Sequence, residues 1–317
     1  MAGIIARRAA SGLLTLLVAS VLVFGALHAI PGDPVQAIAG VDASPETVHA
    51  VRESLGLGRP LVAQYGLWLW HLVRLDLGTS YRLGGPVSAL VAHGLANTVV
   101  LAVSAIALAI VLSLVVSLLW VTRPSRWLDL LAGAAVTLAV SVPSFVSGVL
   151  GVLLFAIVWP VLPSGGVPPK GFFADPGITA QYLLLPATCL ALPAAATLTR
   201  FLSEALRDEW EQPYVLTARA LGTPRWRILT GGVLRNAVPT YITTLGLQVG
   251  GMLGGAVLIE AIFAWPGLGQ LMSQGVGARD YPVVQALVLL AVTVFVVVQI
   301  FTDIIQVLLD PRVRLEA

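Results

Sequence analysis

Formal charge is confined to a few parts of this 317-residue chain, and long stretches carry none. A bilayer-crossing helix needs about 20 apolar residues. Each of the six charge-free stretches is long enough for one crossing, and none is comfortably long enough for two. The pattern predicts an all-α, polytopic membrane protein with six transmembrane helices, at residues 9–30, 95–121, 128–158, 180–206, 237–260 and 283–309.

The composition supports this class of protein and excludes others. The chain is 57% hydrophobic and 11% charged, whereas soluble proteins carry about 25% charged residues. A net charge of +2, with the basic residues divided among several separate segments, is too small to form a nucleic-acid surface. We therefore expect a lipid bilayer around the chain and no nucleic acid as a partner.

The ends of the spans predict the orientation. Arg7 and Arg8 precede an apolar stretch of about 24 residues with no cleavage site before Pro31, so we interpret it as a retained span and not as a signal peptide. With the amino terminus inside, twelve basic residues fall on the cytoplasmic side and six on the other. The positive-inside rule then favours both termini in the cytoplasm.

Three prolines interrupt the predicted spans: Pro143 in the third, and Pro186 and Pro193 in the fourth. Proline removes a helical hydrogen bond, and a neighbouring helix or a water-filled cavity must satisfy the carbonyl that it frees. Two interpretations stay open. Each proline either kinks its helix and improves packing, or marks a helix that lines a moving pathway.

The extracytoplasmic segment, residues 33–94, is too small for a catalytic domain. Ser44 and Pro45 are typical of a helix start, and Gly56 is typical of a helix end. A second amphipathic stretch at 61–75 carries two tryptophans, which suit a membrane interface. We expect this segment to pack over the mouth of the membrane bundle.

The cytoplasmic segment 200–235 holds ten of the 34 charged residues. Pro213 can start a short helix whose Tyr214, Thr217, Ala218 and Leu221 share one stripe. Gly222 can end it in the left-handed conformation. Thr223 as N-cap and Pro224 in the first turn then begin a second helix. We call residues 212–224 the knob; on pattern alone it is either a docking element or a solvated loop.

Several motifs resemble one family. The knob sequence YVLTARALG at 214–222, followed by LRNAVP at 234–239, resembles the cytoplasmic EAA loop of type I ABC importer permeases, and more specifically B-type subunits of the dipeptide/oligopeptide/nickel subfamily. PGDP at 31–34, EAIFAWPGLG at 260–269 and RDYPVVQ at 279–285 are also similar to that family's sequences.

Two positions depart from the family pattern. Leu216 stands where many EAA loops have an acid and B-type relatives often have arginine, so a polar contact is lost there. Pro239 comes one residue earlier than in common relatives. Neither change affects the glycine corner at Gly222, so coupling is still expected.

The resemblance implies an ATP-driven importer in which ATP is hydrolysed by other subunits. The chain has no P-loop, and its one lysine, Lys170, lies on the predicted outer side. The implied partners are two ATP-binding subunits, a second homologous permease subunit and an extracytoplasmic substrate-binding protein. Peptides are the implied substrate, and nickel chelates or glutathione are the alternatives. The implied location is a bacterial inner membrane.

The resemblance divides the chain into an N-terminal transmembrane helix at 1–32, the extracytoplasmic segment at 33–94 and a five-helix core at 95–310. The core includes a cytoplasmic coupling loop at 207–235. The residues expected to couple to the ATPase are Tyr214, Thr217, Ala218, Arg219, Ala220 and Gly222.

Asp33 and Glu260 are candidates for the pathway or gate. Asp33 equally suits a turn between prolines, and Glu260 equally suits a membrane interface. We interpret Trp265 as an interface anchor within a turn. The four histidines lack metal-ligand spacing, so neither a metal site nor a cofactor is expected.

Two other classes of membrane protein fit the sequence less well. A membrane-embedded hydrolase needs a polar catalytic pair within the spans, and Ser141, Ser144 and Ser147 have no such partner. An ion-driven transporter favours acids at mid-membrane, which the spans almost lack.

Overall fold

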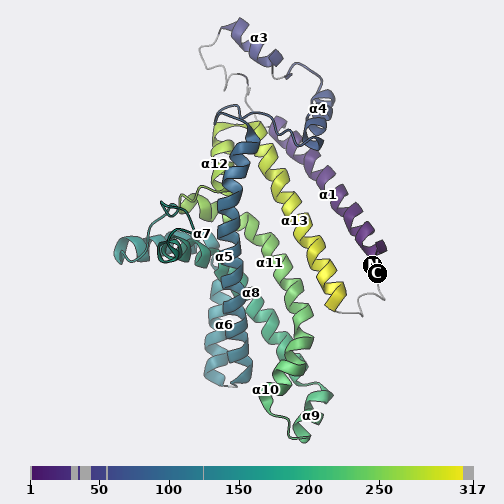
Figure 1. Ribbon diagram of the computed structural model, residues 1–317, viewed down its shortest axis with the longest axis vertical. Coiled ribbons are helices and arrows are strands. Elements are labelled where there is room, and N and C mark those ends of the chain that lie inside the picture. Colours follow the sequence, from purple (N-terminus) through teal and green to yellow (C-terminus); the bar gives the residue numbers. More distant parts are fainter. Residues whose placement is uncertain (1, 30–34, 36–43, 55, 124, 310–317) are drawn as a thin grey trace. The chain divides into compact units, whose positions relative to one another are not determined.

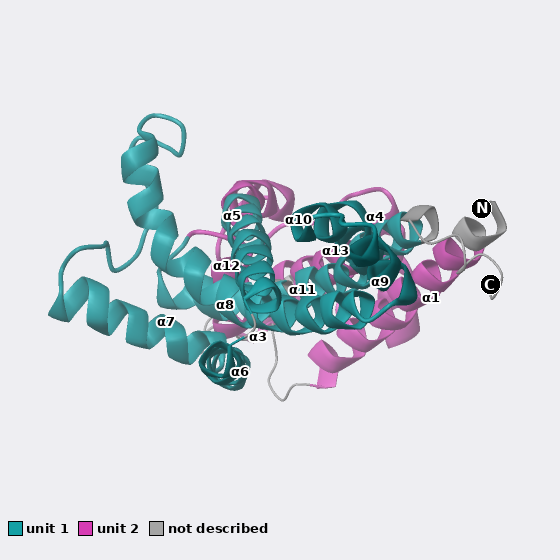
Figure 2. Ribbon diagram, turned by 90° about the horizontal axis from the view of Figure 1, so that it is seen from below, with its two compact units in different colours: residues 1–5, 99–265, 297–317 teal, residues 6–98, 266–296 magenta. Residues whose placement is uncertain are grey.

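The computed structural model describes residues 2–29, 35, 44–54, 56–123 and 125–309. These residues form helices joined by loops, and no strand occurs among them. They divide into two compact units, coloured separately in Figure 2. Unit 1 comprises residues 1–5, 99–265 and 297–317, and unit 2 comprises residues 6–98 and 266–296.

Four helices are each long and apolar enough to cross a membrane. They confirm the predicted first, second, fourth and sixth spans, although the second begins eight residues earlier than predicted. Since Pro86 precedes this helix and its first turns carry no formal charge, nothing in the sequence stops it there. The four are α1 (Ala2–Ala29), α5 (Val87–Thr122), α8 (Pro176–Trp210) and α13 (Tyr281–Leu309).

The predicted third span is broken. In unit 1, α6 (Arg126–Ser141) is followed by α7 (Ser144–Val152), which continues as the π-helix η1 (Leu153–Val158). The two parts meet at 97° (Figure 1). Pro143 forces its predecessor out of the helical region, and Val142 is extended at φ −85° and ψ 116°. Pro143 therefore ends one helix before the next begins, and does not only kink a continuous helix.

The predicted fifth span is also bent. A short helix α10 (Arg225–Ile228) and a π-turn η2 (Leu229–Val233) lead into α11 (Leu234–Ile262). The helical run changes direction by 48° between Met252 and Gly254. The chain thus has four to six candidate spans, depending on whether each bent pair crosses the membrane.

Helix α8 is the centre of unit 1. In the apolar part of α8 that could cross a membrane, 61% of the residues are buried. In the corresponding part of α5 the share is 22%. Its buried face includes five alanines at 187, 191, 194, 195 and 196, and small residues let neighbouring helices approach closely. Pro186 and Pro193 lie inside α8, which continues through both as one helix.

Trp265, just after the end of α11, was expected to anchor a membrane interface, and the structure corrects this expectation. Its side chain is fully buried, and its ring lies 5.6 Å from that of Phe172. The loop before α8 packs on the same place, where the Gly166 N–H donates to the Phe263 carbonyl at 2.7 Å. A Cβ on Gly165 would lie 2.3 Å from that carbonyl oxygen. Trp265 therefore belongs to the core and does not anchor a membrane interface.

Unit 2 contains both predicted amphipathic helices and one that was not predicted. The first, α3 (Pro45–Ser54), begins at the expected proline, and Gly56 after it has a left-handed φ of 67°. The second is α4 (Leu61–Val73). A further helix, α12 (Leu268–Ala278), lies between the predicted spans 237–260 and 283–309, where no helix was predicted.

A buried carboxylate joins distant parts of unit 2. Asp280 is fully buried and accepts hydrogen bonds from the Ser80 hydroxyl and from the backbone N–H groups of Tyr81, Arg82 and Leu83, at 3.1, 2.9 and 3.4 Å. Burial, and secondly the charge of Asp280, raise the pKa of Tyr81. The side chain fixes the loop before α5 to the start of α13.

Replacing Asp280 should destabilise the protein strongly. Asp280→Ala leaves buried N–H donors without an acceptor, and we expect a loss of about 3 kcal/mol. Thermal unfolding of the detergent-solubilised chain measures this. Asp280→Asn keeps one acceptor oxygen and should lose less. The exposed Asp208 provides the control, since Asp208→Ala should change the melting temperature little. A wild-type melting temperature for Asp280→Ala would contradict the assigned role.

Candidate functional site

The predicted knob, residues 212–224, contains one short helix, and a second short helix follows it directly, at one end of α8 and α11 (Figure 1). Helix α8 ends at Trp210, and α9 (Pro213–Ala220) follows with a proline in its first turn. Helix α10 begins at Arg225, one residue later than predicted, because Pro224 is its extended flanking residue and not part of its first turn. All of these elements belong to unit 1.

Gly222 has the left-handed conformation that was predicted, with φ 74°. The Thr223 N–H donates to the Ala218 carbonyl and the Gly222 N–H donates to the Arg219 carbonyl, both at 3.0 Å. These two bonds form a Schellman motif, which ends a helix and turns the chain sharply. The shape of the knob therefore depends on backbone geometry that glycine adopts without strain.

A polar network attaches α9 to its neighbours. The Tyr214 hydroxyl donates to Glu209 Oε2 at 2.9 Å, and Asn236 Nδ2 donates to the same oxygen at 3.1 Å. Burial first, and the bond to Glu209 second, raise the pKa of Tyr214, so the phenol stays a donor at neutral pH. A Cβ on Gly232 would lie 2.9 Å from the Tyr214 ring. Thus hydrogen bonds to the Glu209 carboxylate join α8, α9 and α11.

The knob has a packed face and an exposed face. Val215 is fully buried in the core cluster of unit 1, together with Ile228 and Val233. The predicted stripe is a different face, and it is mostly open to solvent. Leu221 at the tip is 80% exposed, and Trp226 on α10 is 61% exposed.

Two arginines lie over tryptophan rings, one partly buried (Trp210) and one exposed (Trp226). The Arg219 guanidinium lies 5.2 Å from the Trp210 ring centroid, and that of Arg227 lies 5.2 Å from the ring of Trp226. Both distances are typical of cation–π contacts. The exposed face therefore combines arginine guanidinium groups with the large apolar side chains of Leu221 and Trp226.

The six predicted coupling residues all lie on α9 or at its end, so the structure brings them together. Tyr214 is held in the polar network, and Ala218 is half-buried. The Thr217 hydroxyl donates within its own helix to the Pro213 carbonyl at 3.2 Å. Arg219 and Ala220 are exposed.

The two predicted pathway residues do not join this group. Asp33 lies outside the described residues. Glu260 lies near the other end of α11, where its side chain is fully buried. A fully buried carboxylate is a less common feature than a carboxylate at a membrane interface.

A cluster that was not predicted from the sequence joins three helices near the knob. Arg207 Nη2 of α8 lies 2.8 Å from Asp129 Oδ1 of α6, and Trp120 Nε1 of α5 donates to the same oxygen at 2.6 Å. The Arg207 guanidinium also lies 4.9 Å from the Trp120 ring. The sequence does contain a signal for this cluster, because charged and aromatic residues lie at the ends of neighbouring predicted spans.

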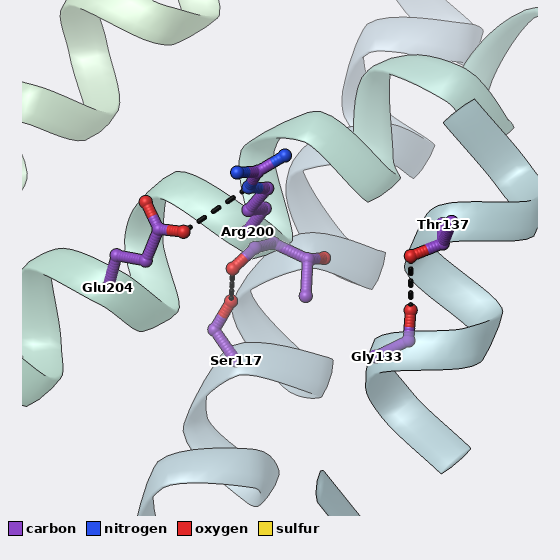
Figure 3. Close-up of polar contacts among 6 residues, drawn as sticks. Ser117, Gly133, Thr137, Arg200 and Glu204 are labelled. Atoms are coloured by element: carbon purple, nitrogen blue, oxygen red, sulfur yellow. Dashed lines mark hydrogen bonds and ion pairs between the residues drawn. The ribbon is translucent and has the colours of Figure 1, made fainter. Parts of the chain in front are cut away.

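Further contacts extend along α8 from this cluster. In Figure 3 the Ser117 hydroxyl of α5 donates to the Thr199 carbonyl of α8 at 3.1 Å. Arg200 pairs with Glu204 one turn further along, with Nε and Oε1 separated by 3.2 Å. Both side chains of that pair are exposed. Helix α8 therefore connects to α5 by a buried hydrogen bond and presents charge on another face.

Known proteins match this chain over its whole length. Residues 109–315 match the family described as binding-protein-dependent transport system inner membrane component, and residues 1–102 match its N-terminal part. A protein of Brucella abortus (strain 2308), assigned by name as a peptide transport system permease protein, is 38% identical over 314 residues, 99% of each chain. The glutathione transport system permease protein GsiC of Salmonella paratyphi A is 34% identical over 301 residues, 95% of each chain.

A solved structure shares the fold. The crystal structure of an amino acid ABC transporter with histidines superposes with a TM-score of 0.50 at 16% identity, covering 71% of this chain and 94% of that one. The matches at both ends of the chain, the full-length relatives and the apolar helices agree with one another. The chain therefore belongs to the binding-protein-dependent transport system inner membrane components, as a multi-pass ABC importer permease subunit of a bacterial inner membrane.

Proposed function

We propose that this subunit forms half of the transmembrane pathway of an ATP-driven importer for dipeptides and oligopeptides, and that the knob couples it to cytoplasmic ATP-binding subunits. The observation that carries the proposal is the knob itself. It is shaped by the Schellman motif at Gly222 and exposes the apolar Leu221 at its tip. The amino and carboxyl termini then lie in the cytoplasm, as the basic residues favour.

The attachment of the knob supports a coupling role. Tyr214 connects it to α8 through Glu209 and to α11 through Asn236. Val215 holds its inner face in the core. A partner that displaces the knob would therefore move two of the longest helices of unit 1, and it would not merely bend a loop. Such rigid-body transmission is a common form of switching between two states.

The relatives support the choice of cargo. The most similar of those described above carries peptide transport in its name, and the Salmonella protein carries glutathione transport. Glutathione is itself a tripeptide, so both names indicate small molecules with amide bonds, an amino group and carboxylates. Glutathione uptake by the same architecture is the second candidate function.

The proposed partners give the first prediction. Purification of the tagged subunit from its native membrane in mild detergent should recover a second homologous permease and two P-loop ATPase subunits. A substrate-binding protein should join when peptide is added. Mass spectrometry of the purified complex identifies them. An active transporter that repeatedly purifies as this chain alone would contradict the subunit assignment.

Gly222 gives the second prediction. A Cβ at this position meets no atom within 4 Å, so Gly222→Val acts through its positive φ, which costs a non-glycine residue about 1–2 kcal/mol. ATP hydrolysis should continue in the assembled complex while peptide uptake falls at least tenfold. Asparagine tolerates the left-handed region, so Gly222→Asn should retain most uptake. Normal uptake by the valine variant would count against the coupling role.

Leu221 gives the third prediction. Leu221→Asp places a charge in the apolar contact of the docked knob, so the ATPase subunits should dissociate from the purified permease. Leu75 is similarly exposed in unit 2, at 83%, and has a positive φ. Leu75→Asp is therefore the matched control and should leave ATPase binding unchanged. Equal ATPase recovery with both variants would show that Leu221 is not a docking residue.

A further inference from the structure

Unit 2 contains a pocket of about 420 Å³ that the proposed coupling does not use. Small-molecule sites commonly occupy about 300–1,000 Å³. Helices α1 and α4, the loop after α3 and the start of α13 supply its walls. The residues that line it include Phe24, His28, Glu53, Arg59, Trp68 and Tyr281.

His28 presents a hydrogen-bonding atom that the described residues leave unsatisfied. Its Nδ1 lies 2.8 Å from the Phe24 carbonyl. A carbonyl only accepts, so Nδ1 carries the proton and the neutral ring leaves Nε2 as an acceptor. Nε2 is buried and has no hydrogen-bond partner in the described part of the chain. Leaving such an acceptor unpaired costs stability, and a ligand N–H would satisfy it.

His28 belongs to a cluster of aromatic rings. The Phe24 ring stacks on His28 with centroids 4.1 Å apart, and Tyr281 lies 6.2 Å from His28. Trp68 lies 5.7 Å from Phe24. The faces of such rings attract organic cations and also bury apolar groups. The inner part of the pocket therefore suits a positively charged nitrogen attached to an apolar body.

The remaining walls carry both signs of charge. Asp76 accepts from the Gly78 N–H at 3.0 Å and from His71 at 2.9 Å, and these bonds lower its pKa, so it is ionised at neutral pH. Glu53 adds a second carboxylate and Arg59 a guanidinium. A zwitterion matches this arrangement better than an anion, a cation or a neutral lipid tail.

We propose that this pocket binds a short peptide by its amino terminus, with the ammonium group donating to His28 Nε2 among the aromatic rings and the carboxylate facing Arg59. The identification of the ligand as a peptide rests on the proposed function, whereas the recognition of an amine rests on the pocket alone. The lining residues of the pocket belong to unit 2, whereas the knob belongs to unit 1.

Direct binding to the purified full-length chain tests the proposal. The chain is placed in nanodiscs of phosphatidylglycerol, a lipid without an amino group, and radiolabelled Ala-Phe is the probe. Binding should be saturable, and N-acetyl-Ala-Phe should bind at least tenfold more weakly because it lacks the ammonium group. His28→Phe, which keeps a ring and removes the acceptor, should weaken Ala-Phe binding at least tenfold.

Two further variants control for misfolding. His49 is exposed on α3 and does not line the pocket, so His49→Phe should bind like the wild type. Arg59 is exposed, and Arg59→Gln should weaken binding of Ala-Phe and leave binding of Ala-Phe-amide unchanged. Wild-type affinity for the acetylated peptide, or wild-type binding by both His28→Phe and Arg59→Gln, would overturn the proposal.

Measuring peptide uptake by the assembled transporter distinguishes a failure of the pocket proposal from a failure of the proposed transport function. Intact Ala-Phe binding with no ATP-driven peptide uptake contradicts the transport proposal and supports the pocket. Peptide uptake that persists when the purified chain shows no saturable Ala-Phe binding supports transport and overturns the pocket.

Discussion

A bilayer offers no hydrogen-bonding partner to a peptide group, and this constraint accounts for most of the architecture. The long apolar stretches satisfy their backbones by forming helices. Where a helix stops within the apolar part of the chain, nearby groups supply the partners. The Val142 N–H donates back to Leu138 beside Pro143, and Gly166 donates to the carbonyl of Phe263 at the end of α11. Glycine at 165 is needed because only its bare backbone fits against that carbonyl.

The sequence predicted those helices and turns that are determined by residues close together in the chain. The absence of charge located the helices, and the sequence around Gly222 predicted a corner that the structure contains. The sequence analysis also placed α3 and α4 correctly. In each case the residues that determine the structure lie within a few positions of one another, so a single sequence contains the necessary information.

Features that depend on distant residues were not predictable in this way. Pro143 indicated a disturbance, but the 97° between α6 and α7 reflects what those helices pack against. Trp265 suits an interface by composition and is buried because Phe172 and the preceding loop cover it. Asp280 was noticed only within a motif. Its four donors come from residues about 200 positions earlier, a pairing that no local pattern reveals.

The exposure of Leu221 has a consequence for the life of the subunit in the cell. A large apolar side chain in water is a feature of docking sites and also of unfolded chains. Chaperones and proteases act on exposed apolar segments, and their action changes protein abundance. A subunit made in excess of its partners would present the tip of the knob to this machinery, and an assembled one would not. The same leucine would then adjust the amount of the subunit to the supply of its partners.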